Sequence, residues 1–203
     1  ATSDGSITVD AGGAITVTSV DTSNTDDDTN DVSLTTTAGD ITVTSINSGS
    51  AGDVALSSAA AIIDDGSPTT VIAGDDLNAA AAGAITIDTS VASITAATSV
   101  AANIDIDETD AVTLHSVTTV DGAIAVTAGA DIVATSVDAN GSTNDNVLLT
   151  ATTGDVTATS VAAADSVTID AVAGSVRDTS VTAETGDIDI DAQLDVTVTN
   201  VTA

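Results

Sequence analysis

The chain has 203 residues, 42% of them hydrophobic, and it contains no Phe, Trp, Tyr, Met or Cys. Its formal net charge is −30, with 31 acidic residues against a single Lys or Arg. This charge excludes nucleic acid and anionic membrane surfaces as partners, because both are bound through Lys and Arg. No apolar run is long enough to cross a bilayer, so membrane insertion is not expected. A core limited to Ile, Val, Leu and Ala suits a thin interior, such as that of a solenoid.

The first two predicted strands are Ser6–Ala11 (SITVDA) and the segment that begins at Ile15 in GAITVTSV. Apolar and polar residues alternate in both, which is typical of a half-buried strand. We name them motif a and motif b. Motif a recurs at Ser6–Ala11, Asp31–Thr36, Asp53–Ser58, Asn103–Glu108, Ala123–Ala128, Asn146–Ala151, Ser166–Ala171 and Asp187–Ala192. Motif b begins at Ile15, Ile41, Val112, Ile132, Val156, Val176 and Val196.

The repeat becomes irregular around residues 59–100. Two segments resembling motif b, Gly83–Val91 and Ala92–Val100, follow each other directly, and the one proline, Pro68, lies in the same region. We expect irregular or shortened turns of the repeat there.

A unit of about 20 residues cannot bury its own apolar face, whereas stacked copies can. The sequence therefore predicts an all-β fold, a parallel β-helix of roughly nine or ten rungs that forms one domain over residues 1–203. Right-handed coiling is expected from the general preference of parallel crossovers. The Thr-Ser-Val segments predict a third side, with their apolar residue turned inward; these residues are Val20, Ile46, Val137, Val161 and Val181. The insertions Asp21–Asp31 and Asp138–Asn146 are predicted to leave the coil at one common corner.

Repeats of the form G-D-[IV]-x-[VA]-T-S-V, seen at Gly39–Ile46 and Gly154–Val161, resemble those of filamentous-haemagglutinin-like exoproteins and giant bacterial surface adhesins. The resemblance covers nearly the whole chain. It implies a right-handed parallel β-helix that is secreted to the cell surface. The absence of Lys and of aromatic residues departs from the usual pattern of that family.

Stacked aspartates are the most informative polar feature. If every motif a lies above the last, outward Asp10, Asp88, Asp107, Asp170 and Asp191 form one column, with Asp105 and Asp189 beside it. Asp170 and Asp191 on consecutive rungs would lie about 5 Å apart, a spacing at which like charges repel. Bound Ca²⁺ would relieve this repulsion, since it prefers oxygen ligands. The alternative is a hydrated acidic surface adapted to high salt.

The two insertions offer further oxygen ligands for Ca²⁺. The first contains Asp26 and Asp28, and the second contains Asp138 and Asp145. Neither matches an EF-hand loop or the glycine-rich nonapeptide of calcium β-rolls. A solvated turn explains both loops equally well.

Thr-x-Thr pairs such as Thr42 and Thr44 could form a flat face that binds ice or glycan. Equivalent positions hold His115, Val133 and Arg177, which interrupt such a face. The other interpretation is an exposed strand surface of β-branched residues. Arg177 is expected to pair with a neighbouring acid such as Asp178.

The sequence offers no nucleophile–base pair, since a single His would have to serve as the base, and it has no aromatic residue for stacking on a sugar. Catalysis and organic cofactors are therefore not expected. The predicted function is a structural, extracellular or cell-surface fibre, stabilised by divalent cations. Its form is an adhesin stalk or a filament of subunits stacked end to end. Expected partners are further copies or a covalent continuation of the array, with cell-surface glycans as another candidate. The ligand-binding Thr face is the alternative function.

Overall fold

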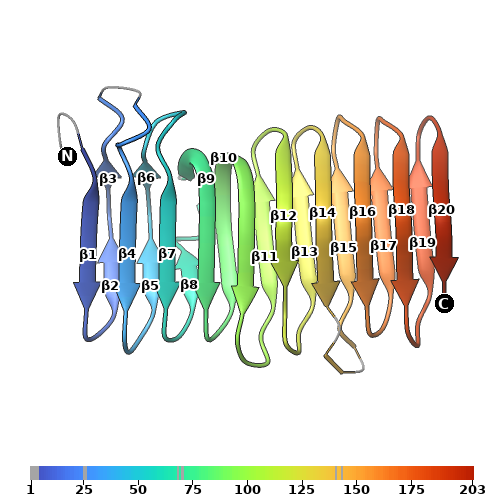
Figure 1. Ribbon diagram of the computed structural model, residues 1–203, viewed down its shortest axis with the longest axis horizontal. Coiled ribbons are helices and arrows are strands. Elements are labelled where there is room, and N and C mark those ends of the chain that lie inside the picture. The colour runs from blue at the N-terminus through green and yellow to red at the C-terminus, as the bar shows by residue number, and fades with distance from the viewer. Residues whose placement is uncertain (1–4, 25–26, 68, 70, 140, 143) are drawn as a thin grey trace.

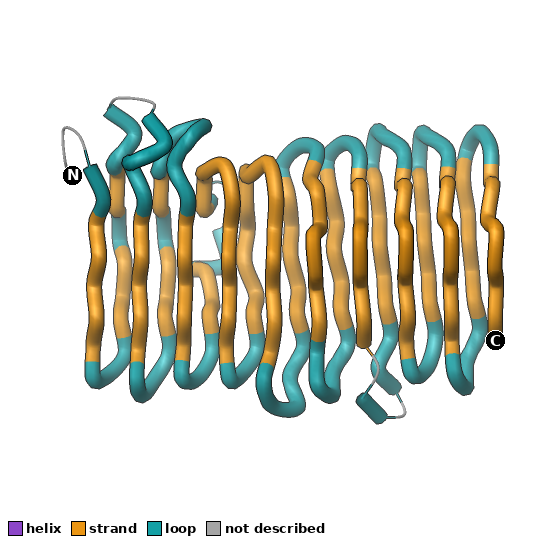
Figure 2. The backbone as a smooth tube through the Cα atoms, in the orientation of Figure 1, coloured by secondary structure: helices purple, strands orange, loops and turns teal. Residues whose placement is uncertain are grey.

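A computed structural model describes residues 5–24, 27–67, 69, 71–139, 141–142 and 144–203, and these residues form a β-solenoid of about nine turns (Figure 1). All strand pairs are parallel, and the described part of the chain contains no helix (Figure 2). Accordingly, none of these residues belongs to a helix able to cross a membrane. The predicted all-β solenoid is confirmed.

Two long sheets face each other across the core. The front sheet of Figure 1 stacks β1 (Ile7–Ala11), β4 (Val32–Thr36), β7 (Val54–Ser58), the end of β9 (Ile72–Ala81), the end of β10 (Ile85–Thr98), β12 (Val112–Thr118), β14 (Ile132–Ala139), β16 (Val156–Ala163), β18 (Val176–Ala183) and β20 (Val196–Thr202). The back sheet stacks β2 (Ile15–Val17), β5 (Ile41–Val43), β8 (Ile62–Asp64), the start of β10, β11 (Ile104–Glu108), β13 (Ile124–Ala128), β15 (Val147–Ala151), β17 (Val167–Ala171) and β19 (Ile188–Ala192).

The strands form because apolar residues occupy most inward positions and stack on their equivalents in the next rung. In β4, inward Val32 and Leu34 are 0% and 1% exposed. The first inward residue of a strand also donates its N–H to the carbonyl before the next strand of the same sheet. Val176 N donates to Asp195 O at 2.9 Å in this way. Each rung is thus held to the next by both burial and backbone hydrogen bonds.

Among the described residues, the third side is confined to the N-terminal half. It consists of β3 (Val20–Asp21), β6 (Ile46–Asn47), the start of β9 and the middle of β10. In the C-terminal half, Thr-Ser-Val lies within long front strands such as β16. The prediction of a third side on every coil is therefore wrong for Val137, Val161 and Val181, although these side chains do point inward as predicted.

The two motifs exchange sheets partway along the solenoid. Motif a forms the front strands β1, β4 and β7 but the back strands from β11 onward, and motif b does the reverse. The prediction that each motif stacks only on itself is therefore wrong. The exchange occurs because the adjacent segments that resemble motif b both lie in β10, which occupies the back sheet, the third side and the front sheet in turn.

The irregular region predicted around residues 59–100 corresponds to β9 and β10, the two longest described strands. A short turn of the solenoid lies here, since Leu77 of β9 pairs with Ile94 of β10, 17 residues later. The two insertions do not share a corner, contrary to prediction. The first connects β3 to β4 at the top of Figure 1, and the second connects β14 to β15 at the bottom.

Candidate functional site

The predicted aspartate column is present on the back sheet as two separate pairs. Asp88 lies beside Asp107, and Asp170 lies beside Asp191, each pair in register on adjacent strands. Thr127 and Thr150 occupy the two rungs between the pairs. The placement of Asp10 in this column is wrong, because β1 belongs to the front sheet.

The flanking aspartates do not extend the column. Asp105 is flanked by Thr86 and Ala125, and Asp189 pairs with Thr168, so neither has an acidic neighbour at the same strand position. Burial raises the pKa of Asp105, with a further contribution from the charge of Asp107. Across the described residues, no three His, Cys, Asp or Glu side chains gather closely enough to hold a metal ion.

The predicted loop ligands are not part of a metal cluster among the described residues. Asp26 lies outside the described residues, and Asp28 is exposed on the first insertion. In the second insertion, Asp138 is the last but one residue of β14, whereas Asp145 is buried. The Asp145 carboxylate accepts a hydrogen bond from Ser142 N at 2.6 Å, so it closes its own loop.

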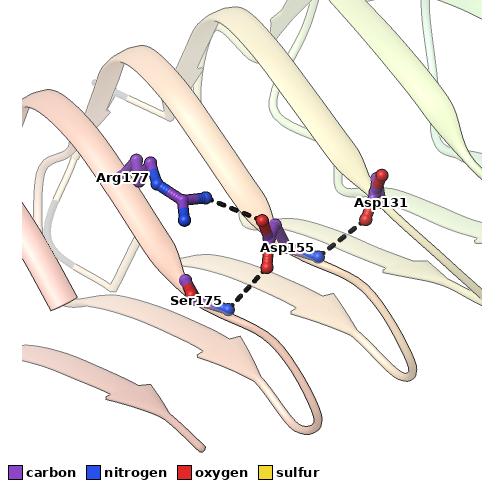
Figure 3. A network of polar contacts seen from close by, with 4 residues as sticks. All are labelled: Asp131, Asp155, Ser175 and Arg177. Atoms are coloured by element: carbon purple, nitrogen blue, oxygen red, sulfur yellow. Dashed lines mark hydrogen bonds and ion pairs between the residues drawn. The ribbon is translucent and has the colours of Figure 1, made fainter. Parts of the chain in front are cut away.

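A different set of acidic residues connects the rungs. Aspartates and asparagines just before a strand accept the backbone N–H of the equivalent residue in the next rung, and we name this set the pre-strand ladder. Figure 3 shows two steps, from Asp155 N to Asp131 and from Ser175 N to Asp155, both at 2.7 Å. Other acceptors are Asp31, Asp40, Asp53, Asn103 and Asn146. Many of the aspartates in the turns therefore have a structural role, because they accept backbone hydrogen bonds from the next rung.

Replacing a ladder carboxylate should destabilise the solenoid through the lost hydrogen bond. In Asp40→Ala, Ala61 N loses its acceptor, and we expect the free energy of unfolding to fall by about 1–2 kcal/mol. Asp40→Asn removes the same charge but keeps Oδ1, as Asn103 does naturally, and should stay within about 0.5 kcal/mol of wild type. Urea unfolding of both variants measures this. Equal losses would show that charge, not the hydrogen bond, matters at this position.

The predicted pairing of Arg177 with Asp178 is wrong. Arg177 is exposed and forms its ion pair with Asp155, at 2.7 Å between Nη1 and Oδ2 (Figure 3). Asp178 follows Arg177 on β18, so it points to the opposite face of the sheet, into the core. Its side chain occupies the position held by Ala158 in the previous rung and by Val198 in the next.

Asp178 is therefore a carboxyl group in an apolar interior. It is 4% exposed, and its Oδ1 accepts a hydrogen bond from Ala158 N at 2.8 Å. Its Oδ2 is buried and has no hydrogen-bond partner among the described residues. Burial raises the pKa of Asp178 to about 6, because an apolar surrounding disfavours the ionised form.

Removing this carboxyl should stabilise the protein at neutral pH. An acid whose folded pKa is raised contributes full stability below its unfolded pKa, and that contribution is lost as pH rises through about 6. Asp178→Ala restores the residue found in the previous rung, and we expect about 2 kcal/mol of added stability near pH 8 after the loss of the Ala158 hydrogen bond. The gain should vanish near pH 4. Chemical denaturation at both pH values tests this, and a gain independent of pH would contradict it.

Glu108 is the second buried acid, and it lies where the third side ends. Its Oε2 accepts hydrogen bonds from Thr89 Oγ1 at 2.8 Å and from Val91 N at 3.1 Å, and its Oε1 accepts one from Asp110 N at 3.3 Å. Val91 belongs to the third side and pairs with Gly74 in the preceding rung, whereas the following rung has no third-side strand. The Glu108 carboxylate therefore accepts the hydrogen bond from Val91 N that a third-side strand in the following rung would otherwise accept. Burial raises its pKa to about 7.

Sequence reasoning missed Asp178 and Glu108 as buried groups, although alignment of the motifs contains the signal. Asp178 aligns with inward Ala158, and Glu108 aligns with inward Ala128. Both are acidic residues at positions that hold an apolar residue in an adjacent rung, Ala158 and Val198 for Asp178 and Ala128 for Glu108.

Two shallow hollows mark the surface. One, of about 560 Å³, lies where the third side ends, and Gly74, Ser90, Val91, Asp110, Ala111 and Ala130 are among the residues that line it. The other, of about 310 Å³, lies on the front sheet beside Asp53, Asp76, Ser93 and His115. In the second hollow, the Ser93 hydroxyl donates a hydrogen bond to the Asp76 carboxylate. Neither hollow contains a metal cluster among the described residues, and His115 lies on the same lining as Ser93 and Asp76.

The Thr-x-Thr pairs do not form one face. Thr42 lies on the back sheet, whereas Thr157 and Thr197 lie on the front sheet. On the front sheet, Val133 and Arg177 flank Thr157 on the adjacent strands.

Comparison with known proteins returned no matching family model, no matching curated protein and no matching solved structure.

Proposed function

We propose that this chain is a structural rod segment of an extracellular or cell-surface fibre, in which further rungs cover both end faces. The observation that carries the proposal is the exposure of core residues at the two ends. Val196 of β20 is 50% exposed, whereas the equivalent Val176 one rung earlier is 0% exposed. At the other end, Val9 of β1 is 39% exposed, and Leu34 one rung later is 1% exposed.

Backbone geometry supports the same proposal. The inward residues of each rung donate their N–H groups toward the next rung, as Val167 N does to Asp187 O at 3.0 Å. In the last rung, the corresponding N–H groups of Ile188 and Val196 point along the same direction, toward the end face. Unpaired strand edges next to apolar side chains favour the addition of further strands.

Divalent cations are proposed to stabilise the rod by reducing repulsion at the pairs Asp88–Asp107 and Asp170–Asp191. The charges of Asp64 and Asp107 already contribute to the raised pKa of Asp88, together with burial, which is the largest cause. We expect excess Ca²⁺ to add about 1–3 kcal/mol of stability relative to a chelator at equal ionic strength. Thermal unfolding in the two buffers checks this. Identical unfolding midpoints in the two buffers would contradict stabilisation by Ca²⁺ and would leave screening by salt as the way in which the repulsion between aspartates is reduced.

Electron microscopy and denaturing gels of the native material test the fibre proposal. We expect rods longer than one chain, with a rung spacing of about 4.8 Å. A long polypeptide on the gel would identify a covalent array, whereas a band near 19 kDa would identify stacked subunits. Rods in the native material that extend only the length of this chain would reject the proposal.

Two variants of the last rung test whether the chain self-associates through its end face. Val198→Lys places a charge among the inward residues of the last rung and should abolish the self-association of the chain. Thr197→Lys adds the same charge on the outward face of the same strand and should leave self-association intact. Sedimentation velocity compares both variants with wild type. Equal behaviour of the two variants would place the contact away from the end face.

A further inference from the structure

We infer that copies of this chain stack head to tail with a rotation of about half a turn about the fibre axis, so that the front sheet of one copy continues as the back sheet of the next. This inference rests on the proposed function, because it specifies how the two end faces meet. The spacing of the inward residues in the first and last rungs supports it.

The last rung contains two strands with different inward spacing. In β19 the inward residues are Ile188, Ile190 and Ala192, at every second position. In β20 they are Val196, Val198 and Val201, with one extra residue before the third. The extra residue corresponds to the bulge that long front strands of the C-terminal half share, where Val161 and Val181 are the equivalents of Val201.

The first rung repeats these two spacings on opposite sheets. In β1, on the front, the inward residues are Ile7, Val9 and Ala11, at every second position as in β19. On the back and third sides, Ile15, Val17 and Val20 carry the one extra residue, as β20 does. The connection from β1 to β2 and that from β19 to β20 also have equal length, with three residues each.

Matching spacings therefore places β1 on β19 and β2–β3 on β20. Because β1 lies on the front sheet and β19 on the back, this match requires the half-turn. Without rotation, both strand junctions would join unequal spacings. Among the described strand pairs, only β10 with β12 shows a register shift, between Ile94 and Thr95, so the solenoid otherwise stacks equal spacings.

The half-turn joint has two consequences that can be observed. Asp191 of one copy would lie beside Asp10 of the next, which extends the acidic pairs of the back sheet and should make assembly stronger at high ionic strength. The fibre would also repeat every two copies. At about nine turns per copy and about 4.8 Å per turn, the axial repeat is about 86 Å.

Engineered disulfides test the joint directly, because the chain has no Cys of its own. The half-turn places Thr8 beside Asp189, and Thr16 beside Thr197, across the joint. All four side chains are exposed on outward positions, so cysteine there should leave the fold intact. In-register residues on adjacent strands lie within disulfide range. T8C/D189C and T16C/T197C, oxidised at high salt, should therefore give ladders of covalent multimers on non-reducing gels.

The matched controls are T8C/T197C and T16C/D189C, which pair only in an unrotated joint and should remain single chains. Ladders from these controls would overturn the half-turn while leaving end-to-end stacking in place. Absence of ladders from all four variants would also overturn it, and a wild-type chain that then sediments as a monomer would count against stacking of copies as well. Circular dichroism of each variant confirms that the solenoid is folded.

Discussion

Glu108→Ala should be among the most destabilising single substitutions in this chain when measured near pH 5, with an expected loss of about 3–5 kcal/mol in the free energy of unfolding. The substitution removes the acceptor for Val91 N and Thr89 Oγ1 in a buried setting. No following third-side strand can replace that acceptor, because the third side ends at β10. Urea unfolding measures the loss. A change below about 1 kcal/mol would show that water satisfies these groups at little cost.

The pH dependence separates the hydrogen bonds from the charge of Glu108. Its folded pKa is raised to about 7, so its contribution to stability is full below the unfolded value of 4.5 and is lost as pH rises through 7. Glu108→Gln keeps one acceptor oxygen and cannot ionise. We expect it to resemble wild type near pH 4.5 and to exceed wild type by about 2–3 kcal/mol near pH 8.5. A constant difference across this range would contradict the raised pKa.

Gly154→Ala is expected to cost about 3 kcal/mol, because the rungs approach too closely there for a side chain. A Cβ on Gly154 would lie 2.5 Å from Asp131 N and 2.6 Å from Ala130 C, both backbone atoms of the preceding rung. The backbone would have to shift, and with it the hydrogen bond from Asp155 N to Asp131 that belongs to the pre-strand ladder (Figure 3). Thermal and urea unfolding measure the cost.

Gly13→Ala is the matched control. Gly13 precedes motif b as Gly154 does, yet a Cβ there would meet no atom within 4 Å, because Gly13 lies in the first described rung. This substitution should leave stability within about 0.5 kcal/mol of wild type in the single chain. If both glycine variants lost the same stability, the cause would be local backbone preference, not contact between rungs.

The sequence by itself determined the class of fold and much of the local detail. Period-two alternation in segments such as Val167–Ala171 predicts strands with Val167 and Ile169 inward, and both are 0% exposed. Repetition at about 20 residues predicts stacking, and it placed Asp170 beside Asp191 correctly. These features depend only on neighbouring residues and on the spacing between consecutive copies of a motif, and both are properties of the linear sequence.

The tertiary structure alone decided which sheet each copy joins and which acids are buried. A single long strand, β10, moves motif a from the front sheet to the back, and no local pattern reports this because both sheets accept the same alternation. That exchange removed Asp10 from the predicted column. Similarly, Asp178 and Arg177 are adjacent in sequence but lie on opposite faces of β18, so Arg177 finds its partner in Asp155 on the preceding rung. Partners of this kind are set by contacts between rungs, which depend on how the whole coil closes.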